Sequence, residues 1–179
     1  MWYRGEIGRI LDFVDTNDYQ AFDDAPWWLP GMFRIIASRF PQSGFVMLKR
    51  PAEDWFRSMK MHSDGRLLGN PIHHASIYQR SDMLIDLAET HNVSPTSALM
   101  KDQLLSANRE AYIRYHLNYH SEVISWFKFN GLDHRLYTGN LYGLDWREIA
   151  SFLGVLSEDS PDTFSEHASN QSVRLKYQQ

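Results

Sequence analysis

The sequence predicts an α/β fold, in which helices pack on a parallel sheet, in a single domain formed by residues 1–179. The apolar run Phe45–Leu48 is continuous, as in a strand that is buried on both faces. It ends in an abrupt turn at Pro51, and helical periodicity follows from Ala52 to Met61. A strand, a turn and a helix in this order form a βα unit of a parallel sheet.

The rest of the chain is mostly helical in pattern, so the fold is expected to be helix-rich. Apolar residues at helical spacing and helix-start signals predict helices over residues 2–14, 27–40 and 109–129, one starting at Ser94-Pro95, and one from Asp145 to Phe152. Short strands are predicted at 19–22 and 135–137. The polar stretch 155–179 has little periodicity and is predicted to be an irregular C-terminal tail.

Composition excludes several classes of function. With 18 basic and 22 acidic residues the net charge is -4, so no nucleic-acid partner is expected. The chain has no cysteine, which excludes disulfides, thiolate zinc sites and a cysteine nucleophile. Neither a signal peptide nor about 18 consecutive apolar residues are found, so we expect no membrane segment and a cytoplasmic protein.

Arg50 and Ser58 are the first candidate binding residues. Arg50 leaves the carboxyl end of the predicted strand, where ligands collect in open α/β sheets, and Ser58 lies in the next helix. A guanidinium can hold a phosphate through two parallel hydrogen bonds, and a hydroxyl can add a third. The alternative is an ordinary surface charge and an ordinary helix residue. Glu53 and Asp54 argue against an anion, since they already compensate the helix dipole in the first turn.

The segment FVMLKRPAEDWFRS resembles the 3′-phosphate-binding element of the sulfotransferases that use 3′-phosphoadenosine 5′-phosphosulfate (PAPS). That element has an apolar strand, an Arg, an Asp-Pro turn, a Trp, and a Ser eight residues after the Arg. Arg50, Trp55 and Ser58 fall in register, whereas Pro51-Ala52 replaces Asp-Pro. Segments upstream (from YQAFDDAP) and downstream (YHSEVISWF and DWREIASFLG) are also similar to the family, so the resemblance covers most of residues 19–170.

The resemblance implies a P-loop NTPase-like three-layer fold and transfer of a sulfuryl group from PAPS to a hydroxyl or amine. It implies that Arg50 and Ser58 hold the 3′-phosphate of PAPS or of adenosine 3′,5′-bisphosphate, with no metal. The acceptor, a small molecule or a glycan, is not specified by the sequence.

One departure from the family concerns the front of the chain. Family members begin with a strand and a Gly-rich phosphate loop, and no such loop precedes Tyr19. We therefore expect an N-terminally truncated sulfotransferase domain, short of its first strand and inactive as an isolated chain. The alternative is a non-catalytic module that binds 3′-phosphoadenosine or a protein.

Three further residues have two interpretations each. Asp24 lies where the family tends to place its general base, which takes the proton of the acceptor. Alternatively, Asp23 or Asp24 caps the following helix. His116 and His120, four residues apart on one helix, have a spacing that could chelate a metal, but a structural pair is the favoured interpretation because no third ligand is evident.

Overall fold

The computed structural model describes residues 6–17, 21–23, 27, 29–61, 72, 75 and 81–155. The described helices are α1 (Ile7–Thr16), α2 (Met32–Arg39), α3 (Ala52–Met61), α5 (Ser81–His91), α6 (Ala98–Ala107), α7 (Arg109–Phe129) and α8 (Trp146–Phe152), with the short 3₁₀ helix η3 (Asp133–Arg135). Strands β1 (Phe45–Lys49) and β2 (Leu136–Asn140) complete the described elements. The helix-rich α/β prediction is confirmed. Of the predicted strand at 19–22, the described residues 21 and 22 are not in a strand, and the tail beyond Val155 lies outside the described residues.

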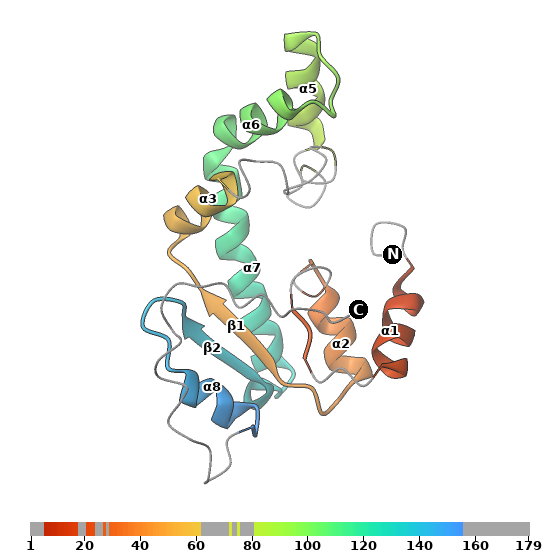
Figure 1. Cartoon of the computed structure of the whole chain (residues 1–179), viewed down its shortest axis with the longest axis vertical. Coiled ribbons are helices and arrows are strands. Elements are labelled where there is room, and N and C mark those ends of the chain that lie inside the picture. The colour runs from red at the N-terminus through yellow and green to blue at the C-terminus, as the bar shows by residue number, and fades with distance from the viewer. Residues whose placement is uncertain are drawn as a thin grey trace, which may run out of the picture.

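The two strands form a parallel pair, as the sequence predicts. Phe45 pairs with Leu136 and Lys49 with Asn140, so both strands end at the same edge. The chain between them crosses over through α3, α5, α6 and α7 (Figure 1). A parallel pair requires a crossover of this kind, because the chain must return to the other end of the sheet.

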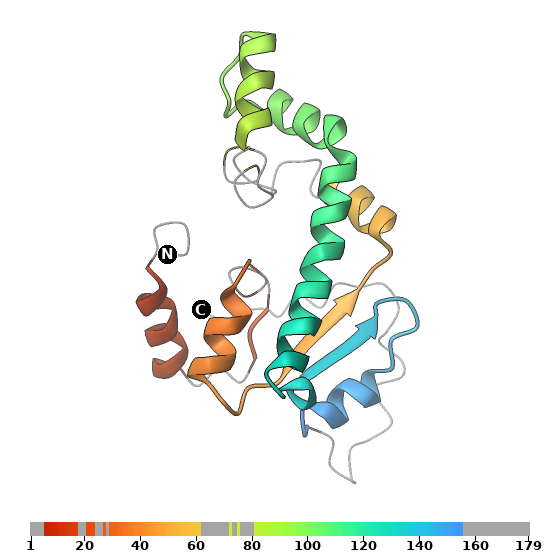
Figure 2. The ribbon, with the colours of Figure 1, turned by 180° about the vertical axis from the view of Figure 1, so that it is seen from behind.

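Helices cover both faces of this pair. Phe45, Met47 and Leu136 pack against Phe33 of α2 and Phe127 of α7, and Figure 2 shows α7 running across this face. On the other face, α8 is in contact through its Phe152, whose ring lies 5.8 Å from that of Tyr137. Successive side chains of each strand point to opposite faces of the sheet. One set therefore faces α2 and α7, and the other set faces α8.

The predicted burial of β1 on both faces is only partly observed. None of its five residues is fully buried, and Val46 is 39% exposed. Within the described residues β1 pairs with β2 alone. A strand with one neighbour has less surface covered than one inside a larger sheet, which explains why the apolar run is less buried than its composition predicts.

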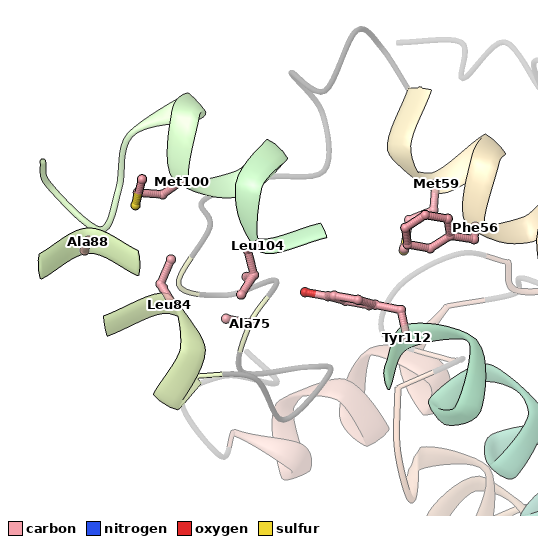
Figure 3. Close-up of a cluster of buried hydrophobic side chains, with 8 residues drawn as sticks. All are labelled: Phe56, Met59, Ala75, Leu84, Ala88, Met100, Leu104 and Tyr112. Carbon is pink, nitrogen blue, oxygen red and sulfur yellow. The ribbon is translucent and has the colours of Figure 1, made fainter. Parts of the chain in front are cut away.

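Helix α7 joins two separate hydrophobic cores. Its end near residue 112 belongs to a cluster with α3, α5 and α6, in which Tyr112 is fully buried beside Leu104 and Phe56 (Figure 3). Its other end belongs to the cluster that packs on the sheet, through Val123 and Phe127. The predicted bounds of this helix, 109–129, are confirmed. One long helix therefore connects the sheet to the projecting α5–α6 pair (Figure 1).

Three helices begin later than predicted, and the first is α1, which starts at Ile7 rather than at residue 2. Helix α2 starts at Met32 rather than at residue 27, because Gly31 precedes it with a φ of 78°, a left-handed conformation that a non-glycine residue rarely adopts. Helix α6 starts at Ala98, four residues after the predicted Ser94-Pro95 start. The hydroxyl of Ser97 accepts from the Met100 N–H at 3.3 Å and so caps this helix.

Arg135 connects the carboxyl end of α2 to the start of β1 through side-chain hydrogen bonds. Its Nε donates to the Ser43 carbonyl at 2.9 Å, and its two terminal nitrogens donate to Ala37 at 3.1 Å and Phe40 at 2.7 Å. Only 9% of the residue is exposed, and burial lowers the pKa of its guanidinium. The last carbonyls of a helix lack partners within the helix, so this cation satisfies the carboxyl end of α2.

Helix α8 begins at the cap that the sequence predicts. The Asp145 carboxylate accepts from the Arg147 N–H at 2.8 Å. Asp145→Ala should lower the free energy of unfolding by about 1 kcal/mol, since it removes an N-cap side chain. Asp145→Asn, which keeps the acceptor oxygen, should stay close to the wild type. Urea unfolding followed by circular dichroism measures both, and an unchanged midpoint in the Ala variant would contradict this role.

Candidate functional site

Arg50 lies at the carboxyl end of the sheet, as predicted. It follows Lys49, the last residue of β1, and Lys49 is paired in register with Asn140 at the end of β2. The residue is half-buried. Its Nε is fully buried and has no hydrogen-bond partner. A buried donor without a partner is uncommon in folded proteins and marks a position that a ligand or a water can satisfy.

The two acidic residues in the first turn of α3 are engaged by neighbours. Glu53 forms an ion pair with Arg109 at the start of α7. Asp54 accepts from the Tyr142 hydroxyl at 3.2 Å and lies 3.5 Å from the guanidinium of Arg57. In the sequence, the negative charges of Glu53 and Asp54 argue against an anion near this helix. In the structure, the positive charges of Arg109 and Arg57 offset them.

Ser58 lies on α3, exposed to solvent. It is one turn beyond Asp54 and Trp55 and thus on the same side of the helix. It lies six positions after Ala52, which places it about 9 Å along the helix axis from the start of α3. Within the described structure Arg50 and Ser58 make no hydrogen bond with each other, so a phosphate would have to lie between them to contact both.

His116 of α7 packs directly against this βα unit. Its ring stacks on Trp55 with centroids 4.3 Å apart and an interplanar angle of 12°. It hydrogen-bonds to the main chain of Arg50, and it is 8% exposed. Its Nε2 is buried without a partner. The contact between His116 and Arg50 could not be predicted from the sequence, because it depends on how α7 crosses the sheet.

His120 lies beside His116, one turn further along α7. The two rings are 4.3 Å apart and tilted by 54°. Burial, followed by the charges of His116 and Lys49, lowers the pKa of His120 to about 4. Burial also lowers the pKa of His116, which the hydrogen bond to Arg50 partly opposes. Within the described residues, no group of three potential metal ligands includes this pair.

The candidate base, Asp24, lies outside the described residues, so its role stays a prediction. The residue that precedes the first turn of α2 is Gly31, so the described Asp23 is not the cap of that helix.

A sulfotransferase domain model matches residues 14–172. The chain belongs to the sulfotransferase family. The match confirms the family resemblance of the chain, and the βα unit that contains Arg50, Trp55 and Ser58 lies within the matched range. No curated protein and no solved structure matches the sulfotransferase chain. In the described part of the chain, no helix is both long and apolar enough to cross a bilayer.

Proposed function

We propose that this sulfotransferase-family chain binds the 3′-phosphate of PAPS with Arg50 and Ser58. The bound PAPS is the donor for transfer of a sulfuryl group to a hydroxyl or amine. The observation that carries the proposal is the buried, unpartnered Nε of Arg50 at the carboxyl end of β1. In α/β sheets of this kind, ligands bind outside the carboxyl ends of the strands.

A phosphate suits the chemistry of this position. An N–H that is buried without a partner costs on the order of 1–3 kcal/mol, and more when the group is charged. A phosphate oxygen removes this cost and accepts from two guanidinium nitrogens at once. The Ser58 hydroxyl, on the same side of α3 as Trp55, supplies a third donor. Lys49, which precedes Arg50, adds a second positive charge at this edge.

The reaction itself needs groups beyond this half-site. PAPS supplies the sulfuryl group. The acceptor oxygen or nitrogen forms a bond to sulfur as the bond between sulfur and the 5′-phosphate oxygen breaks, and the acceptor loses its proton to a base. We assign this role to Asp24, whose pKa would have to lie above its ordinary value near 3.9 for it to be an effective base at neutral pH.

Binding of adenosine 3′,5′-bisphosphate to the purified chain tests the half-site. Arg50→Ala should weaken binding by about 1.5–3 kcal/mol, or roughly 10- to 150-fold, through loss of a charge-assisted contact. Ser58→Ala should cost less, about 0.5–1.5 kcal/mol, because it removes a single neutral donor. Isothermal titration calorimetry measures all three affinities.

Arg57→Ala is the matched control for charge. This guanidinium lies on the same helix, is 71% exposed and pairs with Asp54. Its removal should change the affinity much less than Arg50→Ala, because exposed charges are screened by solvent. If the folded chain does not bind the nucleotide, or if Arg50→Ala binds as the wild type does, the half-site assignment is wrong.

A further inference from the structure

Two residues that contact each other each have a buried side-chain nitrogen without a hydrogen-bond partner. These nitrogens are Nε of Arg50 and Nε2 of His116, and the two residues are joined by the hydrogen bond between the His116 ring and the Arg50 main chain. The ring is also fixed by its stack on Trp55. His116 is therefore a buried residue, 8% exposed, whose ring is held on one side by Trp55 and whose Nε2 has no hydrogen-bond partner.

We propose that His116 is a further binding residue for the phosphate held by Arg50, entering the complex protonated and donating to the anion from Nε2. This proposal rests on the proposed function and adds a residue to the same site. The two phosphate ligands that the sequence predicts belong to one βα segment, since Arg50 directly follows β1 and Ser58 lies in α3, whereas His116 comes from α7.

The tautomer explains why protonation is required. Because Nε2 has no partner, the hydrogen bond to the Arg50 main chain is made by the other ring nitrogen, and this bond favours the protonated ring. In a neutral ring that donates from Nδ1, Nε2 carries only a lone pair and accepts. A phosphate oxygen also accepts. The two can bond only if the ring takes up a second proton.

Burial disfavours the protonated ring of His116 in the free protein and so lowers its pKa. The nearby basic groups are Lys49 at the end of β1, Arg50 directly after it, and His120 of α7. Tyr119, near His120, stays uncharged because burial raises its pKa to about 12. From α3, the carboxylates of Glu53 and Asp54 are engaged by Arg109, Arg57 and Tyr142.

A bound phosphate reverses this balance. It brings negative charge next to the ring and so raises the pKa of His116, which burial lowers in the free protein. The proton is then taken up together with the anion. The contribution of His116 to affinity should increase as the pH falls through the pKa of the complex, and it should level off below the pKa of the free protein.

A buried water that bridges Nε2 and the Arg50 Nε is the simpler account of the two unsatisfied atoms. Such a water would leave His116 neutral both with and without the nucleotide. The affinity conferred by His116 would then not change with pH, so the pH profile separates the two accounts.

The test compares His116→Gln with the wild type in binding adenosine 3′,5′-bisphosphate at pH 6, 7 and 8. Glutamine keeps a polar side chain that does not titrate. The wild type's advantage in affinity should grow about three- to tenfold from pH 8 to pH 6, since one pKa unit corresponds to a factor of ten. The phosphate groups themselves titrate near pH 6, but this affects both proteins equally and cancels in the ratio.

His120→Gln is the matched control, one turn along the same helix. It should retain the pH-dependent advantage, because the pKa of His120, about 4, keeps that ring neutral over this range. A second measurement needs no variant. Ring ¹⁵N resonances of His116 at pH 7 should change from a neutral imidazole to an imidazolium when the nucleotide is added to the wild-type chain.

The outcomes separate this inference from the proposed function. If Arg50→Ala loses binding while His116→Gln follows the wild type at every pH, the half-site stands and the role of His116 is overturned. A His116 ring that remains neutral in the complex overturns it as well. If the folded wild-type chain binds no nucleotide, both proposals fail together.

Discussion

The purified 179-residue chain, incubated with labelled PAPS and a panel of hydroxyl and amine acceptors, should form no sulfated product above background. Sulfuryl transfer depends on preorganised donors that stabilise the charge on the transferred group and on the leaving phosphate. The family resemblance places most of these donors on a Gly-rich loop, which the printed sequence does not contain. Loss of one such donor typically lowers the rate about 100- to 1000-fold, and several would be missing together.

Arg50 and Ser58 cannot replace that loop, because in the proposed complex they contact the 3′-phosphate at the other end of the nucleotide. The decisive comparison uses Asp24→Asn, with the neighbouring Asp23→Asn as matched control. Turnover that survives Asp23→Asn and disappears in Asp24→Asn would show that another segment of the chain provides the donors. The expected inactivity would then be wrong, and Asp24 would be supported as the base.

Arg135→Ala should destabilise the fold by about 3–5 kcal/mol, the largest loss we expect from a single substitution. The guanidinium donates to three main-chain carbonyls, of Ala37, Phe40 and Ser43, from a position that is 9% exposed. Hydrogen bonds to a charged group contribute about 1.5–3 kcal/mol each, but they are not additive. Urea unfolding followed by tryptophan fluorescence measures the loss.

Two control variants separate geometry from charge. Arg135→Lys keeps the charge but has a single donor group at the tip, so it cannot reach three separate carbonyls and should recover less than half of the loss. Arg34→Ala removes an exposed ion pair with Glu122 and should cost under about 1 kcal/mol. Equal stability of the Arg135→Ala and Arg34→Ala variants would show that the carbonyls are satisfied equally well by water.

The elements that the sequence predicts best are those with strong local signals. The bounds of α7 and α3, the strand that begins at Phe45, and the cap of α8 are confirmed. The errors concern features that depend on distant neighbours or on backbone conformation. The later start of α2 follows from the left-handed Gly31, and the exposure of Val46 follows from the number of strands beside β1.

The candidate site was predictable only in part, for a similar reason. Arg50 and Ser58 belong to one continuous βα segment, so their spacing along the chain was enough to select them. His116 is 66 positions away from Arg50, and its contact with Trp55 exists only because α7 packs beside α3. The sequence indicated His116 only as one member of the pair that it forms with His120.

The position of His116 on α7 has a thermodynamic consequence. The helix contributes Tyr112 to one core and Phe127 to the other, and His116 lies between these two contacts. In many proteins, separate cores open as separate cooperative units, each with its own free energy. A ligand held jointly by β1, α3 and α7 would bind only when both units are closed. Its binding energy would therefore oppose the opening of either one and make the two halves behave as a single cooperative unit.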